Sequence, residues 1–265
     1  MTLSDIRPTT RRRIGRISSY VIFLAIVVVA CLFADWSVIK QNFFNAKVAG
    51  DLWPGIVRAA VNTIVYTVIA FVVGLAMAIV LALLKMGHGP FKWFAVAWIE
   101  LFRGVPALLT IFFFGLALPM AFPGLRFPGG LTGGGIVGLM LVTSAYTAEI
   151  IRAGIEAVPK GQREAARSLG MSHLRTTVTV ILPQAIRIVI PPLTNEVVML
   201  LKDTSLLSVI GATLTSKELT TFATDNLAIH ANSTPLMVSA VVYLIISVPL
   251  TYVVGRLEKK MAVKK

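Results

Sequence analysis

Charged residues are scarce in this chain. Of its 265 residues only 14% are Asp, Glu, Lys or Arg, whereas 56% are hydrophobic, and the mean hydropathy is +0.82. A soluble domain of this size carries roughly 25% charged residues. The apolar side chains exceed what one globular core can bury, so the sequence predicts a membrane protein.

Cysteine and the motifs of enzymes are almost absent. The single cysteine, Cys31, lies in an apolar run and can form no intramolecular disulfide. The sequence has no G-x-x-x-x-G-K-[ST] phosphate loop, no H-E-x-x-H and no G-x-S-x-G. Its three histidines are scattered at His88, His173 and His230. We therefore expect no catalytic residues, no metal site and no cofactor bound by this chain.

Acidic residues are outnumbered by basic ones, 12 to 25, which gives a net charge of +13. Such a balance is also typical of nucleic-acid-binding proteins. Here, however, the basic residues lie in short runs between apolar segments, where lysine and arginine set the orientation of membrane spans. We therefore predict no nucleic-acid partner.

Five segments are apolar enough to span a membrane, which takes about 20 residues per helix, and a sixth, 186–211, is more polar. The first, within 17–36, follows Arg11, Arg12, Arg13 and Arg16 and could be a signal peptide. No small-residue cleavage site follows cleanly, so an uncleaved span is favoured. The other expected spans cover 56–84, 94–118, 134–155, 186–211 and 236–254.

The segment 186–211 is the hardest to assign because it contains several polar residues. If it spans, eighteen lysines and arginines lie on one side of the membrane and five on the other. This asymmetry matches the positive-inside rule. We therefore expect six spans with both termini in the cytoplasm, including basic tails at 1–16 and 257–265. Between the spans, the Gly/Pro-rich stretch 123–135 is expected to form turns.

Several charged side chains fall inside the expected spans, where each costs about 2.5–3.5 kcal/mol. Glu100 and Arg103 are three residues apart on one helix, as are Glu149 and Arg152. In the next span Asn195 and Lys202 share a face, and Glu196 and Asp203 share the neighbouring one. Two interpretations stay open, structural ion pairs or the lining of a solute path. The candidate path residues are Glu100, Arg103, Glu149, Asn195, Lys202 and Asp203.

Prolines are expected to interrupt two of these spans. Pro106 cannot donate a hydrogen bond to the carbonyl of Phe102, so a kink or weakened turn is expected there. Pro191 and Pro192 are expected to break the helix entering the fifth core segment, and broken helices often border a transport path.

The polar loop 158–183 interrupts the apolar pattern. Residues 162–169 predict about two helical turns, and Gly170 suits the left-handed end of a helix. A second amphipathic segment, 172–182, ends at Pro183. By its physical properties this loop could be an interfacial helix pair on the lipid headgroups or a docking site for a soluble partner.

The motifs of this loop resemble a known family. Glu164-Ala165-Ala166, followed by Gly170 and by Ile181-Leu182-Pro183, resembles the EAA loop of membrane subunits of ATP-binding-cassette importers. Further runs narrow the resemblance to the polar amino-acid permease subfamily of the bacterial plasma membrane. These runs are 100–106, 148–162 and 201–206.

The resemblance implies a type I importer fold, all-α, with five core helices within 56–256 and one extra N-terminal helix. It also implies two cytoplasmic ATPase subunits that bind ATP and Mg, a second permease subunit (this chain or a sister) and an extracytoplasmic amino-acid-binding protein. The coupling helix that seats in the ATPase would comprise Arg163, Glu164, Ala165, Ala166, Arg167, Ser168, Leu169 and Gly170.

The function expected is that of a permease subunit that imports polar or charged amino acids by alternating access. An ion-coupled secondary transporter is the first alternative, but the six segments show no internal repeat. A membrane-embedded enzyme is the second, but the sequence has no convergent catalytic set.

Overall fold

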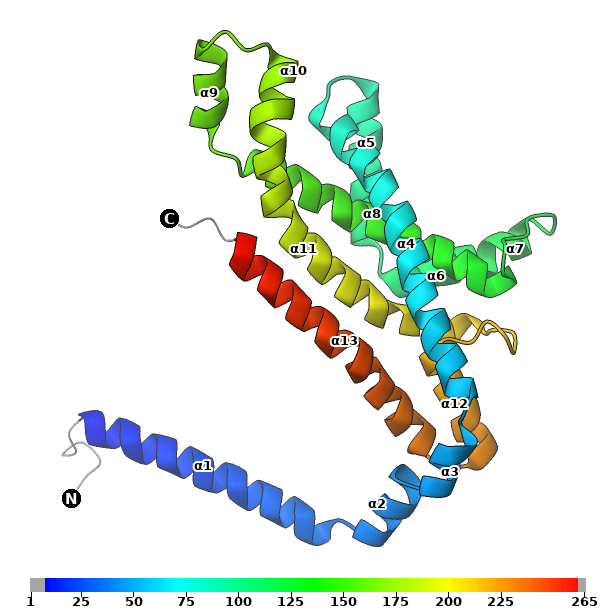
Figure 1. Cartoon of the computed structure of the whole chain (residues 1–265). Coiled ribbons are helices and arrows are strands. Elements are labelled where there is room, and N and C mark those ends of the chain that lie inside the picture. Colours follow the sequence, from blue (N-terminus) through cyan, green and yellow to red (C-terminus); the bar gives the residue numbers. More distant parts are fainter. Residues whose placement is uncertain (1–7, 262–265) are drawn as a thin grey trace.

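The computed structural model describes residues 8–261, with side chains described for residues 18–259. The predicted basic tails therefore lie largely outside the described side chains. Every regular element in this part of the chain is a helix (Figure 1). The elements are α1 Pro8–Phe33, α2 Trp36–Phe43, α3 Ala46–Asp51, α4 Gly55–Met86, α5 Pro90–Gly104, α6 Ala107–Phe112, η1 Phe113–Ala117, α7 Leu118–Ala121, α8 Gly130–Glu156, α9 Lys160–Ser168, α10 His173–Thr176, η2 Thr177–Ile181, α11 Leu182–Asp203, η3 Thr204–Ile210, α12 Leu219–His230 and α13 Thr234–Met261.

The helices confirm the prediction of an all-α, multi-span protein. Four are long and apolar enough to cross a membrane: Gly55–Met86, Gly130–Glu156, His173–Ile210 and Thr234–Lys259. Two further pairs of helices pass the same test together, but each is bent, by 79° between α1 and α2 and by 104° between α5 and α6. The described residues therefore supply four to six candidate spans.

The helix α8 is the centre of the bundle. It contacts α4, α5, α6 and α11, and Figure 1 shows it crossing behind α4. The approach to α4 is close because a Cβ added to Gly74 would lie 3.0 Å from the Cβ of Thr143. Small residues allow such close helix packing in membranes, where van der Waals contact is a main driving force.

The glycines that open α8 correct one expectation. We expected turns throughout 123–135, but α8 already begins at Gly130. A Cβ added to Gly134 would lie 2.5 Å from the carbonyl oxygen of Phe114 in η1. These glycines therefore serve close helix packing as well as turn formation, and a Gly-rich pattern alone does not distinguish the two.

The bend between α5 and α6 has a local cause. Val105 is extended, with ψ at 131°, and Pro106 has ψ at 134°. A proline disfavours helical geometry in the residue before it. The interruption predicted at Pro106 is confirmed, and it is a complete break rather than a weakened turn.

The break expected at Pro191 and Pro192 is wrong, because α11 continues through both. Because Pro191 and Pro192 have no backbone N–H, the carbonyls of Arg187 and Ile188 receive no hydrogen bond from them within the helix. The next turn is reinforced, since the hydroxyl of Thr194 donates to the carbonyl of Ile190 at 2.6 Å. Contacts with α8 and α13 hold the helix in place.

Two wide π turns interrupt the helices, and both end at a Leu-Pro step. In η1 the amide of Leu118 donates to the carbonyl of Phe113, and in η2 the amide of Leu182 donates to that of Thr177. Pro119 and Pro183 follow directly. A proline ring clashes with the carbonyl four residues earlier, and a widened turn relieves this clash.

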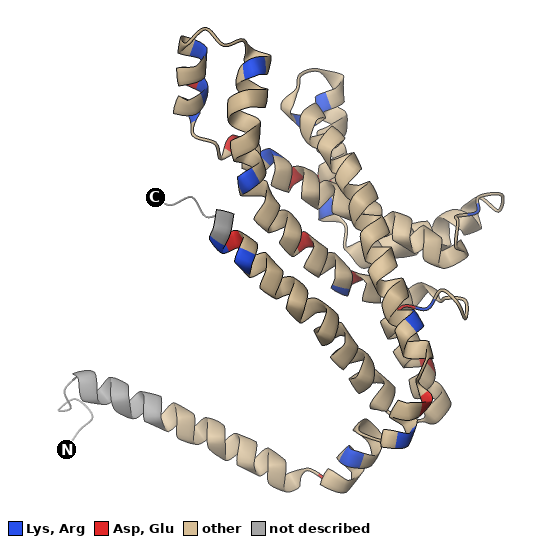
Figure 2. Ribbon diagram, in the orientation of Figure 1, with Lys and Arg blue, Asp and Glu red and all other residues tan. Residues whose placement is uncertain are grey.

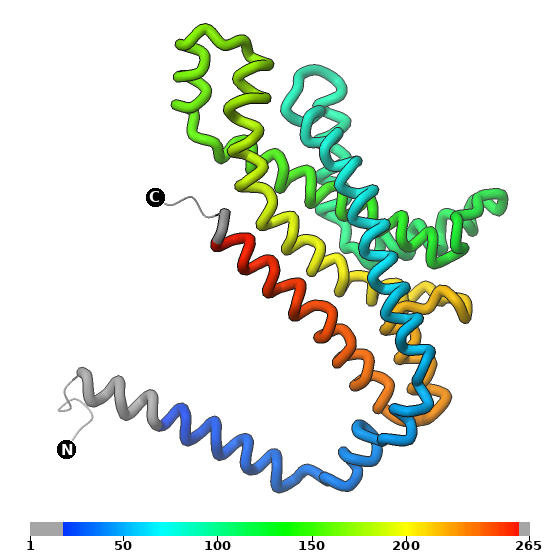
Figure 3. The backbone as a smooth tube through the Cα atoms, in the orientation of Figure 1, coloured from blue at the N-terminus to red at the C-terminus, as the bar shows by residue number. Residues whose placement is uncertain are grey.

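The N-terminal helices form an arm attached at one point. Residues 18–33 of α1 are exposed and run away from the rest of the chain (Figure 3). Near the α12–α13 turn, the amide of Ser233 donates to the carbonyl of Asn42 at 2.8 Å, and the amide of Asn45 donates to the hydroxyl of Thr234 at 3.0 Å. The attachment therefore lies at α2, α3 and α13.

Candidate functional site

The predicted coupling segment forms the helix α9, which stands at one end of the structure beside α10 (Figure 1). Ala166 is 5% exposed, whereas the other residues of α9 are exposed. Ala166 turns inward because α9 contacts η2. A helix anchored by one small side chain leaves its charged faces available to a partner.

The end of α9 is tightly organised around Gly170. The left-handed conformation predicted for this glycine is present, with φ at +79°. The amide of Met171 donates to the carbonyl of Ala166 at 3.2 Å, and that of Gly170 donates to the carbonyl of Arg167 at 3.0 Å. This pair of hydrogen bonds is the Schellman motif. The Arg167 guanidinium also donates to the carbonyl of Met171 at 2.5 Å.

The surface of α9 and of the turn that follows it carries both charged side chains and an exposed apolar one. Arg163, Glu164 and Arg167 are exposed, and Leu169 is 84% exposed. A hydrogen bond also ties α9 to α11, since the side-chain amide of Gln184 donates to the side-chain oxygen of Gln162 at 3.4 Å. A charged helix with an exposed leucine at its end can dock into a protein cleft or rest on a membrane surface.

The pair Glu149–Arg152 is present as predicted, and it belongs to a larger cluster. Lys85 of α4 lies 2.9 Å from the second oxygen of Glu149. Arg152 donates to the first oxygen of Glu149 and also to Glu156. Both Glu149 oxygens are therefore occupied, and the cluster joins α4 to α8. The role of Lys85 could not be predicted from the sequence, because Lys85 lies 64 residues from Glu149.

The pair Glu100–Arg103 behaves differently. Both side chains are exposed on α5, and Arg103 lies over the ring of Tyr146 in α8, 5.6 Å from its centroid. Within the described side chains, no ion pair joins Glu100 to Arg103. Glu100 and Arg103 lie on the same face of α5 as predicted, but they form no ion pair with each other in the described structure.

The polar residues of α11 divide between two environments. Asn195 and Lys202 are exposed, while Glu196 and Asp203 are partly buried. Figure 2 shows these charges along α11, apart from the charged cluster at the end of α8. Hydrogen bonds and ion pairs between the described side chains do not connect the α5 pair with the α11 group.

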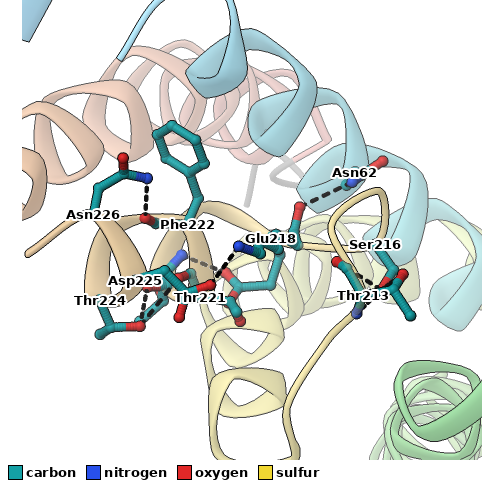
Figure 4. Close-up of polar contacts among 11 residues, drawn as sticks. Asn62, Thr213, Ser216, Glu218, Thr221, Phe222, Thr224, Asp225 and Asn226 are labelled. Atoms are coloured by element: carbon teal, nitrogen blue, oxygen red, sulfur yellow. Dashed lines mark hydrogen bonds and ion pairs between the residues drawn. The ribbon is translucent and has the colours of Figure 1, made fainter. Parts of the chain in front are cut away.

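A polar network in the loop between η3 and α12 was not predicted (Figure 4). The Asn62 amide of α4 donates to the carbonyls of Thr215 and Lys217 at 2.9 and 2.8 Å. One turn later, the Tyr66 hydroxyl donates to the carbonyl of Ser216 at 3.0 Å. Two polar side chains four residues apart on an apolar helix were the available signal.

Glu218 closes this network at the start of α12 and is 1% exposed. It accepts hydrogen bonds from the amides of Thr220 and Thr221, both at 2.6 Å, and from the hydroxyl of Tyr243 at 3.1 Å. Burial raises the pKa of Glu218 above its ordinary value, and these hydrogen bonds oppose the rise. The carboxyl thus caps α12 and ties it to α13.

Metal binding finds no support in the part of the chain with described side chains. No three His, Cys, Asp or Glu residues there are grouped so that they could hold a metal ion. The bundle of bent spans and the projecting polar helix are instead those of a membrane-embedded transport subunit.

Comparison with known proteins defines the family. Residues 70–263 match the family described as "Binding-protein-dependent transport system inner membrane component", and the chain belongs to this family. It is 34% identical to the probable glutamine ABC transporter permease protein GlnM of Bacillus subtilis, over 88% of this chain and 97% of that protein. It is 37% identical to the L-cystine transport system permease protein TcyB of Bacillus subtilis, over 65% of this chain and 69% of that protein.

A solved structure extends the comparison. The chain matches the crystal structure of an amino acid ABC transporter with histidines at 34% identity and a TM-score of 0.73, over 80% of this chain and 96% of the other. The resemblance to importer permeases drawn from the EAA loop is confirmed. The chain is the multi-pass, inner-membrane permease component of an ABC transporter, and ATP hydrolysis resides on a separate subunit.

Proposed function

We propose that this permease imports polar or charged amino acids by alternating access. The observation that carries the proposal is the 34% identity to a permease named for glutamine, which extends over 97% of that protein. The solved relative is likewise an amino acid transporter. Because the relatives are named for both glutamine and L-cystine, their names support the class of substrate rather than one amino acid.

The proposed complex contains two cytoplasmic ATPase subunits, a second permease subunit and an extracytoplasmic amino-acid-binding protein. Both termini lie in the cytoplasm. The permease domain comprises 56–256, with the N-terminal span at 17–36 as an addition. The family description, which names a binding-protein-dependent system, supports this composition.

Residues 163–170 are proposed as the coupling element, within the loop 158–183. The exposed charges of α9 and the left-handed turn at Gly170 support this role, because a helix that transmits motion from the ATPase must keep its conformation under load. ATP binding would then favour one of two packings of the bundle. The contact of α9 with η2, which continues into α11, offers a route for this motion.

The path is proposed to run beside the exposed face of α11. Asn195 and Lys202 on that face would be costly against lipid, so a second permease subunit is expected to cover them. Glu100, Arg103 and Asp203 are retained as path candidates. Glu149 is fully occupied by Lys85 and Arg152, which favours a structural role over contact with solute.

Uptake into proteoliposomes tests the proposal. The complete complex, purified with its ATPase, is reconstituted with its binding protein, and uptake of labelled amino acids is measured with ATP and with ion gradients collapsed. ATP-dependent uptake that survives gradient collapse is expected. Uptake that requires an ion gradient and ignores ATP would instead establish a secondary transporter. In the same assay, Glu164→Arg is expected to abolish transport while the complex stays assembled, and Glu258→Arg, on the exposed end of α13, serves as its control.

A further inference from the structure

The C-terminal part of α13 bears an open groove of about 410 Å³. Its lining residues recur every three or four positions and therefore share one face of the helix. They are Val248, Thr251, Tyr252, Gly255, Arg256 and Lys259. The groove is apolar at the Val248 end and basic at the Lys259 end, and Figure 2 shows basic residues together with an acidic one at that end of α13.

The basic end is organised by local contacts. The Arg256 guanidinium lies 4.5 Å from the centroid of the Tyr252 ring and donates to the Tyr252 hydroxyl at 2.6 Å. Beside it, Gly255 leaves a notch, since no heavy atom beyond its chain neighbours and the local helix backbone lies within 4 Å of the position that a Cβ would occupy. Lys259 is exposed one turn later. An arginine held in place beside an open notch can receive an oxyanion.

The charge at this end is not neutralised by its neighbours. Glu258 is exposed, but it lies two residues from Arg256, about 200° around the helix. Neither Arg256 nor Lys259 forms an ion pair with a described side chain. The helix α13 contacts α11, α12, α2, α3 and α4.

We propose that this groove binds an anionic phospholipid. Arg256 and Lys259 hold the phosphate, and an acyl chain lies along Thr251 and Val248. From Val248 to Lys259 the helix rises about 16 Å, about the depth of one leaflet of a 30 Å hydrocarbon core. The order of apolar, aromatic and basic residues along the groove therefore matches that of acyl chain, interface and headgroup.

Lipid binding to the purified permease complex tests this site without relying on transport. The detergent-solubilised complex is titrated with dioleoyl phosphatidylglycerol and, separately, with dioleoyl phosphatidylcholine. Bound lipid is counted by native mass spectrometry. Arg256→Gln with Lys259→Gln is compared with Arg187→Gln with Lys92→Gln, which removes the same charges elsewhere on exposed helix surface.

The groove variant is expected to bind phosphatidylglycerol about 30-fold more weakly, which corresponds to about 1 kcal/mol for each basic residue. Phosphatidylcholine binding should not change, and the control should keep wild-type affinity. A charge-preserving variant, Arg256→Lys with Lys259→Arg, should retain most of the binding and so separates loss of charge from misfolding. Equal affinity in the groove and control variants would overturn the proposal. Dissociation of the second permease subunit from the groove variant, with lipid binding unchanged, would also overturn it and identify a subunit interface.

Discussion

Lys85 and Glu149 join two helices of the bundle through an ion pair of 2.9 Å, with side-chain exposures of 16% and 20%. Arg152 shares the same carboxylate. Because Lys85 and Arg152 both pair with the Glu149 carboxylate, exchanging Glu149 and Arg152 would place an arginine next to Lys85. A simple charge swap therefore cannot test this cluster, and Lys85 must be included.

The first prediction concerns Lys85→Met. Removing the ammonium leaves a largely buried carboxylate with one donor fewer, so we expect a loss of about 2 kcal/mol in the free energy of unfolding and about 5 °C in Tm. The double variant Lys85→Met with Glu149→Met should be less destabilised than the single one, because the carboxylate is removed together with its lysine and Arg152 keeps its ion pair with Glu156. Thermal unfolding in detergent provides the measurement. Lys92→Met, at an exposed site, is the control, and an equal loss in both lysine variants would contradict the pair's role.

The second prediction concerns Gly170→Val. The left-handed backbone at this position costs a β-branched residue at least 1–2 kcal/mol, so the turn that ends α9 should distort. We expect the complex to assemble normally. Its transport rate should fall at least tenfold, because the coupling element no longer keeps its conformation. Uptake is measured alongside ATPase activity. Gly161→Ala, with open space around it and no positive φ, should behave like the wild type. Normal transport by Gly170→Val would contradict a role of this turn in coupling.

The third prediction concerns Asn62→Leu. The side chain loses both hydrogen bonds to the carbonyls of Thr215 and Lys217, each contributing about 1 kcal/mol. Amide hydrogen exchange across 213–217 should accelerate by at least tenfold, whereas exchange in α8 should not change. Val61→Leu, on the exposed face of the same helix, is the matched control. Unchanged exchange would mean that Tyr66 and the loop's own contacts suffice.

The fourth prediction is a pH dependence at Glu218. Its pKa is raised in the folded state above the ordinary value of 4.5, chiefly by burial. The stability that this group contributes is therefore fully present below pH 4.5 and is lost as pH rises through the raised pKa. Glu218→Gln keeps an oxygen to cap α12 and does not titrate. The difference in Tm between Glu218→Gln and wild type should therefore grow above pH 4.5 and then level off. A constant offset in Tm between Glu218→Gln and wild type over this pH range would contradict the titration.

Hydropathy and charge asymmetry predicted the helical class and the approximate positions of the spans, because burial in lipid constrains every residue of a span. Local chemistry predicted the break at Pro106 and the left-handed Gly170. The same proline argument failed at Pro191 and Pro192, where neighbouring helices hold α11 continuous.

The contacts that the sequence analysis missed are long-range ones. Lys85 meets Glu149 across 64 residues, and Asn62 reaches Thr215 across 153. Periodicity shows which residues share a face of one helix, but the neighbour of that face depends on how the bundle packs. For this reason Glu149–Arg152 was found and Lys85 was not.

The two π turns have a consequence for helix phase. Each π turn contains one residue more than the α-helical turn that it replaces. Since an α-helix turns by about 100° per residue, the helical segments before and after a π turn are offset by about 100° from their positions in an uninterrupted helix. In η2 this offset lies between the coupling element and the polar face of α11. Pro183 prevents the turn from tightening, since the clash would return. The rotational setting of α10, against which α9 packs, relative to Asn195 and Lys202 is thus fixed by one surplus residue and one proline.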